Sequence, residues 1–282
     1  MIIDFHTHTF PARVAERIIA QLTSNGNVPH YSDGSPEGLS ASMQRAGIEC
    51  AVNLPVMTRP DQVVHIHDGL LQNLPWFEEH GIITFGGMHP AFEAFREEIL
   101  RLKEHGIKGI KLHPAYQQTD LDDPRYLKLI DAASEAGMIT ILHAGLDIGF
   151  PEHDYASVDH ILTVLKEVRP EKLVLAHMGG WQNWDLVEKY LAGAPLWLDT
   201  AFSLGELGPA PDEMKPGTYH YNLTQEDFVR LVRKHGADHV LFGSDSPWAD
   251  QTDYLGRLLD MPLTDVEKEA ILGINAAKLL EL

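Results

Sequence analysis

Short apolar runs rich in Ile, Val and Leu alternate with longer segments of helical period along almost the whole chain. Near-continuous apolar runs are typical of strands in a parallel sheet that is covered on both faces. The pattern predicts eight strands, over Ile2–His6, Glu49–Leu54, Ile82–Met88, Gly109–His113, Ile139–His143, Leu173–His177, Leu196–Thr200 and Val240–Ser244. The amphipathic segments between them predict helices over Pro36–Ala46, Gln62–Trp76, Ala91–Glu104, Pro124–Glu135, Tyr155–Val168, Trp184–Leu191 and Thr224–His235.

Eight repeated strand–helix units in 282 residues favour a (β/α)8 TIM barrel, an α/β fold, as one domain over residues 1–282. The alternative is an open doubly wound sheet, which usually carries a glycine-rich phosphate loop after its first strand. Here His-Thr-His-Thr stands at that position. The longest irregular stretch, Ser203–Asn222, follows the seventh predicted strand and is expected over the barrel mouth.

Charge and composition limit the classes of partner that we expect the protein to bind. The chain has 41 acidic and 22 basic residues and a formal net charge of −19, which argues against binding to nucleic acid or an anionic membrane. One cysteine permits no internal disulfide. Asp4 and His6 interrupt the first apolar run, unlike a signal peptide, and no run approaches the roughly 18 residues of a membrane span. We therefore expect a cytoplasmic protein with a small-molecule substrate.

Histidines and one aspartate stand where predicted strands end. His6 and His8 are two residues apart, so they share one face of a strand and can reach one metal ion. His143, His177 and Asp245 each follow an apolar run at a strand-to-loop junction, where burial is costly unless the group is paired or metal-bound. Any one of them alone suits a satisfied core residue or a cap, but the five together indicate a shared metal site.

Other candidates have weaker support. Lys111 ends the fourth strand, where we expect it to contact an anionic substrate or a neighbouring carboxylate. His113 and His89 either line the pocket or hydrogen-bond a loop, and Trp248 is a candidate pocket wall. The second His-x-His pair, at residues 65 and 67, lies in a helical segment and is expected on the surface.

The motifs resemble those of a known family, the amidohydrolase superfamily, and within it the amidohydrolase-related branch that includes aminocarboxymuconate semialdehyde decarboxylase. The resemblance spans nearly the whole chain. It rests on the segments His6-Thr7-His8, Gly109–Pro114, Ala176–Gly180, Leu241–Trp248 and Gly273–Leu280.

This resemblance implies a mononuclear site in which His6, His8, His143 and Asp245 hold one divalent metal. Zn²⁺ suits imidazole and carboxylate ligands, while Mn²⁺, Fe²⁺ and Co²⁺ are alternatives. His177 and Asp245 are the implied catalytic residues, and a homodimer is usual among such proteins. If Lys111 were carbamylated, His177 would become a ligand of a second ion.

Three functions follow from these residues. The first is hydrolysis of an amide, lactone or other ester by a metal-activated water, with Asp245 as the base. The second is non-oxidative decarboxylation of an unsaturated or aromatic carboxylic acid. The third is a metal-binding barrel without activity, which the presence of both His177 and Asp245 disfavours.

Overall fold

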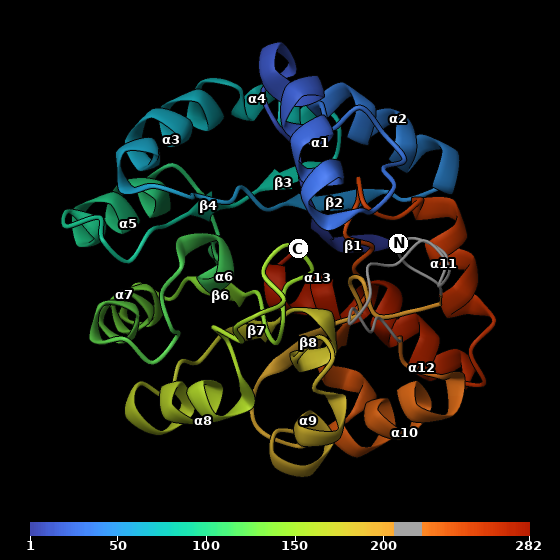
Figure 1. Cartoon of the computed structure of the whole chain (residues 1–282). Helices are drawn as coiled ribbons and strands as arrows, with labels where there is room; N and C mark the ends of the chain where they lie inside the picture. Colours follow the sequence, from blue (N-terminus) through green and yellow to red (C-terminus); the bar gives the residue numbers. More distant parts are fainter. Residues whose placement is uncertain (206–221) are drawn as a thin grey trace.

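The computed structural model describes residues 1–205 and 222–282, which form a (β/α)8 barrel of parallel strands surrounded by helices (Figure 1). Each predicted strand is confirmed, and the third is divided at Phe85 into β3 and β4. The strands are β1 (Ile3–Thr7), β2 (Cys50–Asn53), β3 (Ile82–Thr84), β4 (Gly86–Gly87), β5 (Gly109–Leu112), β6 (Ile139–Leu142), β7 (Leu173–Leu175), β8 (Trp197–Asp199) and β9 (Val240–Leu241).

Two sheets share the ring, with strand orders β1-β2-β3 and β4-β5-β6-β7-β8-β9. Phe85 links β3 to β4 within one continuous stretch of chain. On the other side, the Phe5 amide donates to the Phe242 carbonyl (2.7 Å) and the Asp245 amide to the His6 carbonyl (2.8 Å). The first and last strands therefore lie side by side, and His6 comes next to Asp245 although 239 positions separate their numbers.

An inner apolar cluster fills the barrel. Its members come from strands all round the ring and from the last helix, so they meet across the barrel axis. They include Ile3, Phe5, Val52, Phe85, Ile141, Val174, Trp197, Leu241 and Leu279. The alternate residues of the same strands, such as Ile110, Leu142 and Leu198, belong to a second cluster that packs against the helices. This alternation is the period of two expected for strands covered on both faces.

The first strand contains an irregularity between Asp4 and Thr7. Asp4 pairs with Ala51 and Thr7 with Asn53, so β1 advances by three residues while β2 advances by two. One extra residue in a strand is a β-bulge, which re-aims the side chains that follow it. Phe5 lies in the inner cluster and His6, its direct neighbour, also reaches the centre of the barrel.

The helices begin and end where local signals predict. Helix α2 begins after Ser35, whose hydroxyl accepts from the Gly38 amide (2.9 Å), and ends at Gly47 with φ +70°. The helices are α1 (Ala12–Gly26), α2 (Pro36–Ala46), α3 (Val63–Gln72), α4 (Leu74–Glu79), α5 (Phe95–Glu104), α6 (Pro114–Gln117), α7 (Pro124–Glu135), α8 (Val158–Glu167), α9 (Trp184–Tyr190), α10 (Gln225–His235), α11 (Gln251–Leu259), α12 (Asp265–Glu269) and α13 (Asn275–Leu280). Helices α2 and α7 match the prediction residue for residue, and the predicted helix Gln62–Trp76 is divided into α3 and α4. Helices α1 and α6 and the helices after β9 were not predicted.

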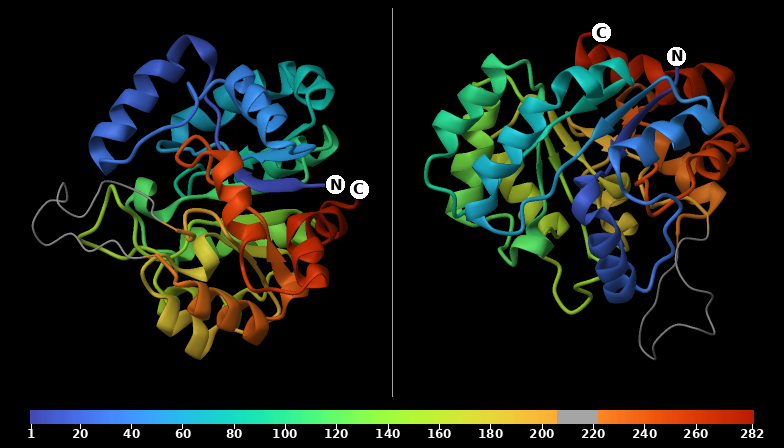
Figure 2. Two further views of the ribbon diagram at one scale, coloured as in Figure 1. Left: turned by 90° about the vertical axis from the view of Figure 1, so that its right-hand side faces the viewer. Right: turned by 90° about the horizontal axis from the view of Figure 1, so that it is seen from above.

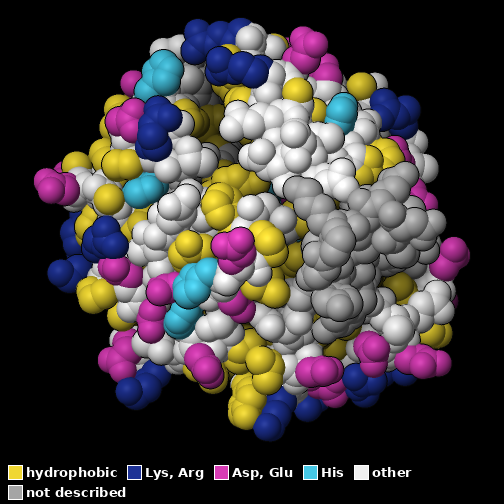
Figure 3. Space-filling view, viewed as in Figure 1, with side chains coloured by type: hydrophobic (Ala, Val, Ile, Leu, Met, Phe, Trp, Pro, Cys, Tyr) yellow, Lys and Arg dark blue, Asp and Glu magenta, His cyan; other side chains and the backbone are white. Residues whose placement is uncertain are grey.

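Both chain termini lie at the same end of the barrel (Figure 2). Most of the irregular stretch Ser203–Asn222 lies outside the described residues, so its expected place over the mouth stays a prediction. On the face shown in Figure 3, acidic and basic side chains of the described residues alternate around the rim. In the described chain, no helix combines the length and apolar character of a membrane span.

The prediction that the second His-x-His pair lies on the surface was wrong for His67. His65 is exposed, but His67 is buried. Its Nδ1–H donates to Glu98 Oε1 (2.6 Å), and its Nε2 accepts from the Gly87 amide (3.2 Å). The two side chains point in different directions, as helical spacing requires, and that of His67 points toward β4 and α5.

The buried pair of His67 and Glu98 predicts a pH-dependent contribution to stability. Burial alone would raise the pKa of Glu98, but hydrogen bonds from His67 and Arg101 outweigh it and lower the pKa to about 2. We expect Glu98→Gln to lower the free energy of unfolding at pH 7 by about 1–3 kcal/mol. Because the pKa of Glu98 is lower in the folded than in the unfolded protein, its carboxylate stabilises the fold at pH values above the pKa of the unfolded state. This stabilisation is lost as the pH falls toward about 2.

Urea unfolding of both proteins at pH 7 and at pH 3 measures this difference. The matched control is Glu97→Gln, because Glu97 is exposed on the same helix. A difference between wild type and Glu98→Gln that is the same at both pH values would contradict the assignment.

Candidate metal centre

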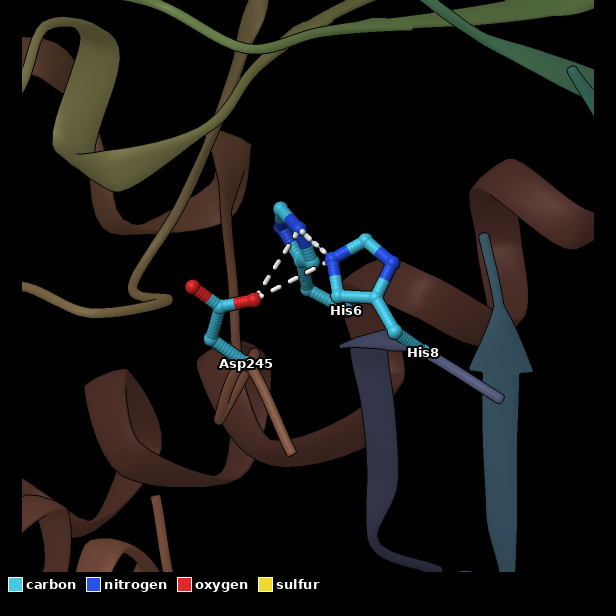
Figure 4. Close-up of side chains that lie close together, drawn as sticks. All are labelled: His6, His8 and Asp245. Carbon is cyan, nitrogen blue, oxygen red and sulfur yellow. Dashed lines mark hydrogen bonds and ion pairs between the residues drawn. The ribbon is translucent and has the colours of Figure 1, made fainter. Parts of the chain in front are cut away.

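Three side chains from opposite ends of the sequence meet at the carboxyl end of the barrel (Figure 4). The Nε2 atoms of His6 and His8 are 3.2 Å apart. Asp245 Oδ1 lies 3.6 Å from His6 Nε2 and 3.2 Å from His8 Nε2. Two ligands about 2.1 Å from a tetrahedral ion are roughly 3.4 Å apart, so the spacing of these donor atoms suits one shared ion.

His143 and His177 border the same centre. His177 Nε2 is 3.0 Å from His143 Nδ1, and the rings of His177 and His6 are 5.4 Å apart between centroids. The structure therefore brings together the five residues that the sequence singled out. Within this group, His6, His8 and Asp245 form the tight triad, and His143 contacts the triad's neighbour His177.

Each of these imidazoles donates its hydrogen away from the centre. His8 Nδ1 lies 2.6 Å from the Leu54 carbonyl, His177 Nδ1 2.9 Å from the Ala201 carbonyl, and His143 Nε2 3.2 Å from the Leu146 carbonyl. A carbonyl oxygen only accepts, so each of these nitrogens carries the hydrogen. In the same way, His6 Nδ1 donates to the Asp199 carboxylate (2.7 Å).

When such a ring is neutral, its second nitrogen presents a lone pair. Those nitrogens face inward: Nε2 of His6, His8 and His177, and Nδ1 of His143. Lone pairs about 3 Å apart repel unless a hydrogen or a cation lies between them. The chemistry of this donor set, with the Asp245 carboxylate beside it, fits a divalent ion of the kind that imidazole and carboxylate bind.

The charges at the centre agree with this reading. Burial lowers the pKa values of His6, His143 and His177, which keeps the rings neutral. Burial alone would raise the pKa of Asp245, but the neighbouring His6 and His8 outweigh it and hold the pKa well below its usual range. Asp245 is therefore a carboxylate at neutral pH.

Lys111 is fully buried, with its Nζ 3.2 Å from His6 Nε2. Burial lowers its pKa to about 8, although the carboxylates of Asp199 and Asp245 act in the opposite direction. Below this pKa its amine is a positive charge next to the centre, and its expected contact with a substrate or a carboxylate stays a prediction.

Two of these residues have left-handed backbone conformations, His177 with φ +59° and Asp245 with φ +68°. Such values are uncommon outside glycine and persist where surrounding contacts hold them. The His177 amide donates to Asp199 Oδ1 (3.0 Å) and the Asp245 amide to the His6 carbonyl. Each turn is therefore fixed by a neighbouring strand of the barrel.

Sequence reasoning missed two buried carboxylates that support the centre. Asp199 ends β8 and contacts His6, and Asp4 in β1 accepts from the Ser244 amide (2.9 Å) and from Gln251 Nε2 (2.7 Å). The position of Asp199 at a strand end was a signal equal to that of Asp245. Asp4 gave none, because it precedes the bulge inside an apolar strand.

A second group of buried residues, His113, His143 and Asp147, lies beside the centre. The rings of His113 and His143 stack 4.2 Å apart, and each Nε2 is 3.7 Å from Asp147 Oδ2. His113 Nδ1 accepts from the Tyr116 amide (3.4 Å), so the neutral ring carries its hydrogen on Nε2, as His143 does. Both N–H edges face the Asp147 carboxylate at ion-pair distance, while the hydrogen of His143 is accepted by the Leu146 carbonyl.

His89 and Trp248, two residues that the sequence suggested for the pocket, make other contacts in the structure. His89 Nδ1 accepts from the Ala91 amide (3.1 Å), which is the loop contact considered as its alternative. Trp248 is half-buried and packs against the outer apolar cluster, and its amide donates to the Asp245 carbonyl (2.8 Å). No contact in the described chain joins either side chain to the five central residues.

A cavity of about 320 Å³ lies at the other end of the strands. Lys172 and His239, which line it, directly precede β7 and β9, and Trp197 begins β8. The residues of the metal centre follow the strands, so the cavity and the centre are separate.

A (β/α)8 barrel with imidazoles and a carboxylate at its strand ends defines the class of metal-dependent barrel enzymes. This chain belongs to the amidohydrolase family, whose model matches residues 3–282. A comparison with curated protein sequences finds no match.

Solved structures share the fold at low sequence identity. The 5-carboxyvanillate decarboxylase from Sphingomonas paucimobilis superposes with a TM-score of 0.70 at 13% identity, over 100% of this chain and 99% of that one. An uncharacterised TIM-barrel protein from Bordetella bronchiseptica gives 0.71 at 21% identity, over 99% and 98%. A dihydroxybenzoic acid decarboxylase from Polaromonas sp. JS666, with bound manganese and the inhibitor 2-nitroresorcinol, gives 0.68 at 16% identity, over 100% and 97%.

The close approach of Gly243 to His6 yields a prediction about this centre. A Cβ atom added at Gly243 would lie 2.8 Å from the Cβ of His6, so Gly243→Ala must displace His6. We expect at least a roughly tenfold loss of affinity for Zn²⁺ or Mn²⁺, the low end of the range for disturbed ligand positioning. Isothermal titration of the metal-free protein measures this.

The matched control is Gly256→Ala, because a Cβ added there meets nothing within 4 Å. Equal metal affinity in the wild type and Gly243→Ala would contradict the placement of His6 as a ligand.

Proposed function

We propose that this protein is a metal-dependent carboxy-lyase that releases CO2 without oxidation from an unsaturated or aromatic carboxylic acid. The observation that carries the proposal is the gathering of four imidazole rings at the strand ends, with the His6 and His8 rings beside the Asp245 carboxylate and the His143 and His177 rings in contact next to them. The fold supports the choice of reaction, because several similar structures are of decarboxylases, one with bound manganese. For that reason we place decarboxylation ahead of the hydrolysis that the sequence favoured.

We assign His6, His8, His143 and Asp245 as the metal ligands. The first three residues offer a nitrogen lone pair to the centre and the fourth offers a carboxylate oxygen. When bound, a divalent ion supplies a Lewis acid that holds an oxygen of the substrate. Zn²⁺ and Mn²⁺ both suit this donor set.

The reaction breaks the bond between a substrate carbon and its carboxylate carbon. The electron pair stays on the substrate carbon, which takes up one proton as CO2 leaves. We assign the delivery of this proton to His177, whose Nε2 faces the centre while its Nδ1–H is committed to Ala201. Because Nε2 carries a lone pair in the neutral ring, it would first take up a proton from the solvent and then pass it to the substrate carbon, which returns the ring to its neutral form. Lys111 provides a buried positive charge that attracts an anionic substrate.

Hydrolysis of a lactone, another ester or an amide is the second candidate. The position of Asp245 favours it, because an ionised carboxylate beside the centre can accept a proton from water. The same residues would serve both reactions, so the substrate decides between them.

Turnover of a substrate panel distinguishes the two reactions. We expect CO2 release from carboxylated phenols or muconate-type acids, loss of this activity after treatment with a chelator, and recovery when Zn²⁺ or Mn²⁺ is added back. The reason is that the Lys111 ammonium group beside the ligands can attract an anion but cannot act as the Lewis acid that a bound divalent ion would supply. Released CO2 and substrate loss are measured together.

Lactones, esters and amides form the other half of that panel. Hydrolysis of any of these without CO2 release from the acids would overturn the decarboxylase assignment in favour of the second candidate. Bound metal with no turnover of any compound would favour the inactive barrel.

Two variants separate metal binding from proton transfer. His143→Ala is expected to empty the metal site, whereas His177→Asn is expected to keep the metal and lose about 10²- to 10⁴-fold in kcat. Metal content by elemental analysis and kcat are measured on both variants. Equal loss of metal in the two would show that His177 is a ligand.

A further inference from the structure

We propose that Asp199 is a positioning residue that fixes the tautomer of His6 and thereby keeps the inner nitrogen of His6 free to bind a cation. Asp199 is wholly buried at the end of β8. Its Oδ2 accepts from His6 Nδ1 (2.7 Å), and its Oδ1 accepts from the amides of His177 and Ala201 (3.0 Å each). One carboxylate therefore holds groups on both sides of the centre.

The support behind His6 differs from that behind the other three rings. The outer nitrogens of His8, His143 and His177 donate to backbone carbonyls, which no side-chain substitution removes. Behind His6 alone, among the central imidazoles, the acceptor is a side chain. On the outer side of the ring, the tautomer of His6 consequently depends on the identity of residue 199, and the Lys111 ammonium group, which donates to Nε2, favours the same tautomer from the inner side.

The two oxygens of Asp199 accept hydrogen bonds from different groups, so the effect of replacing the carboxylate with the amide of asparagine can be predicted. Two backbone N–H groups point at Oδ1, so in Asp199→Asn the amide oxygen must stay on that side. The amide NH2 group then faces His6 Nδ1 and donates to it. His6 would have to carry its hydrogen on Nε2, which is the nitrogen that faces His8, Lys111 and Asp245.

The same substitution behind a histidine of a catalytic triad leaves the geometry intact but selects the wrong tautomer. Asparagine matches aspartate in size, so the fully buried site need not repack. The predicted change is thus one of tautomer: the lone pair of His6 moves from Nε2, which faces the centre, to Nδ1, which faces residue 199. Loss of an outer-shell partner of a metal-binding histidine typically weakens metal affinity 10- to 100-fold.

This inference rests on the proposed metal function, but its test begins on metal-free protein. Long-range ¹H–¹⁵N spectra of the imidazole groups distinguish Nδ1–H from Nε2–H rings, and the signals of His6 are identified by their absence in His6→Asn. We expect His6 of the wild type to carry its hydrogen on Nδ1 and His6 of Asp199→Asn to carry it on Nε2. Zn²⁺ or Mn²⁺ titration should then show the 10- to 100-fold weaker binding.

Asp4→Asn is the matched control. Asp4 is also wholly buried and close to His6 in the chain, but its carboxylate contacts Ser244, Gln251 and the backbone amide of His6, and no imidazole ring. We expect this variant to be less stable and to keep the Nδ1–H tautomer of His6. A merely structural effect of losing a buried charge would appear in both variants alike.

Several outcomes overturn the proposal. They are an Nε2–H tautomer of His6 in the wild type, an unchanged tautomer in Asp199→Asn, and a tautomer change in Asp4→Asn equal to that in Asp199→Asn. The wild-type spectrum keeps the test decisive if Asp199→Asn does not fold. A tautomer switch in a protein that binds no metal would uphold the role of Asp199 while the proposed function fails.

Discussion

The hydrogen bonds that each central imidazole donates outward are the interaction on which the site depends. Their acceptors are the carbonyls of Leu54, Leu146 and Ala201 and the carboxylate of Asp199. These groups follow or end β2, β6 and β8, so they are in place only when the barrel is closed. A neutral imidazole has one hydrogen, and committing it to the barrel wall leaves the inner nitrogen able to bind a cation.

The bulge in β1 makes this arrangement compatible with a packed barrel. Phe5 contributes to the inner apolar cluster, and its ring meets that of Phe85 edge to face at 6.1 Å. Without the bulge, strict alternation would turn His6 away from the face that Phe5 occupies. The extra residue between Asp4 and Thr7 lets one strand supply both the apolar filling and the first two imidazoles.

The sequence predicted the strands, two helices to the residue and the five central residues, because apolar period and strand-end chemistry are local signals. It did not predict the bulge, because bulges follow from how two strands pair, and that pairing also decides which way His6 points. It missed Asp199, which also stands at a strand end, because its partners His6 and His177 belong to other parts of the barrel and reach it only in the folded chain. It misplaced His67 because helical spacing shows only that His65 and His67 point in different directions. It does not show which of the two faces another strand or helix.

Charge balance gives a separate argument that the centre is built for a divalent ion. Three buried carboxylates, those of Asp147, Asp199 and Asp245, lie around one buried ammonium group, that of Lys111. Burial raises the pKa values of Asp147 and Asp199 to about 6, so keeping both carboxylates ionised has a cost that a nearby cation offsets. When all three carboxylates are ionised, the excess over Lys111 is two negative charges, and one divalent cation compensates it. The lone pairs of the imidazoles and the charge of the carboxylates thus require the same partner, although they arise from different residues.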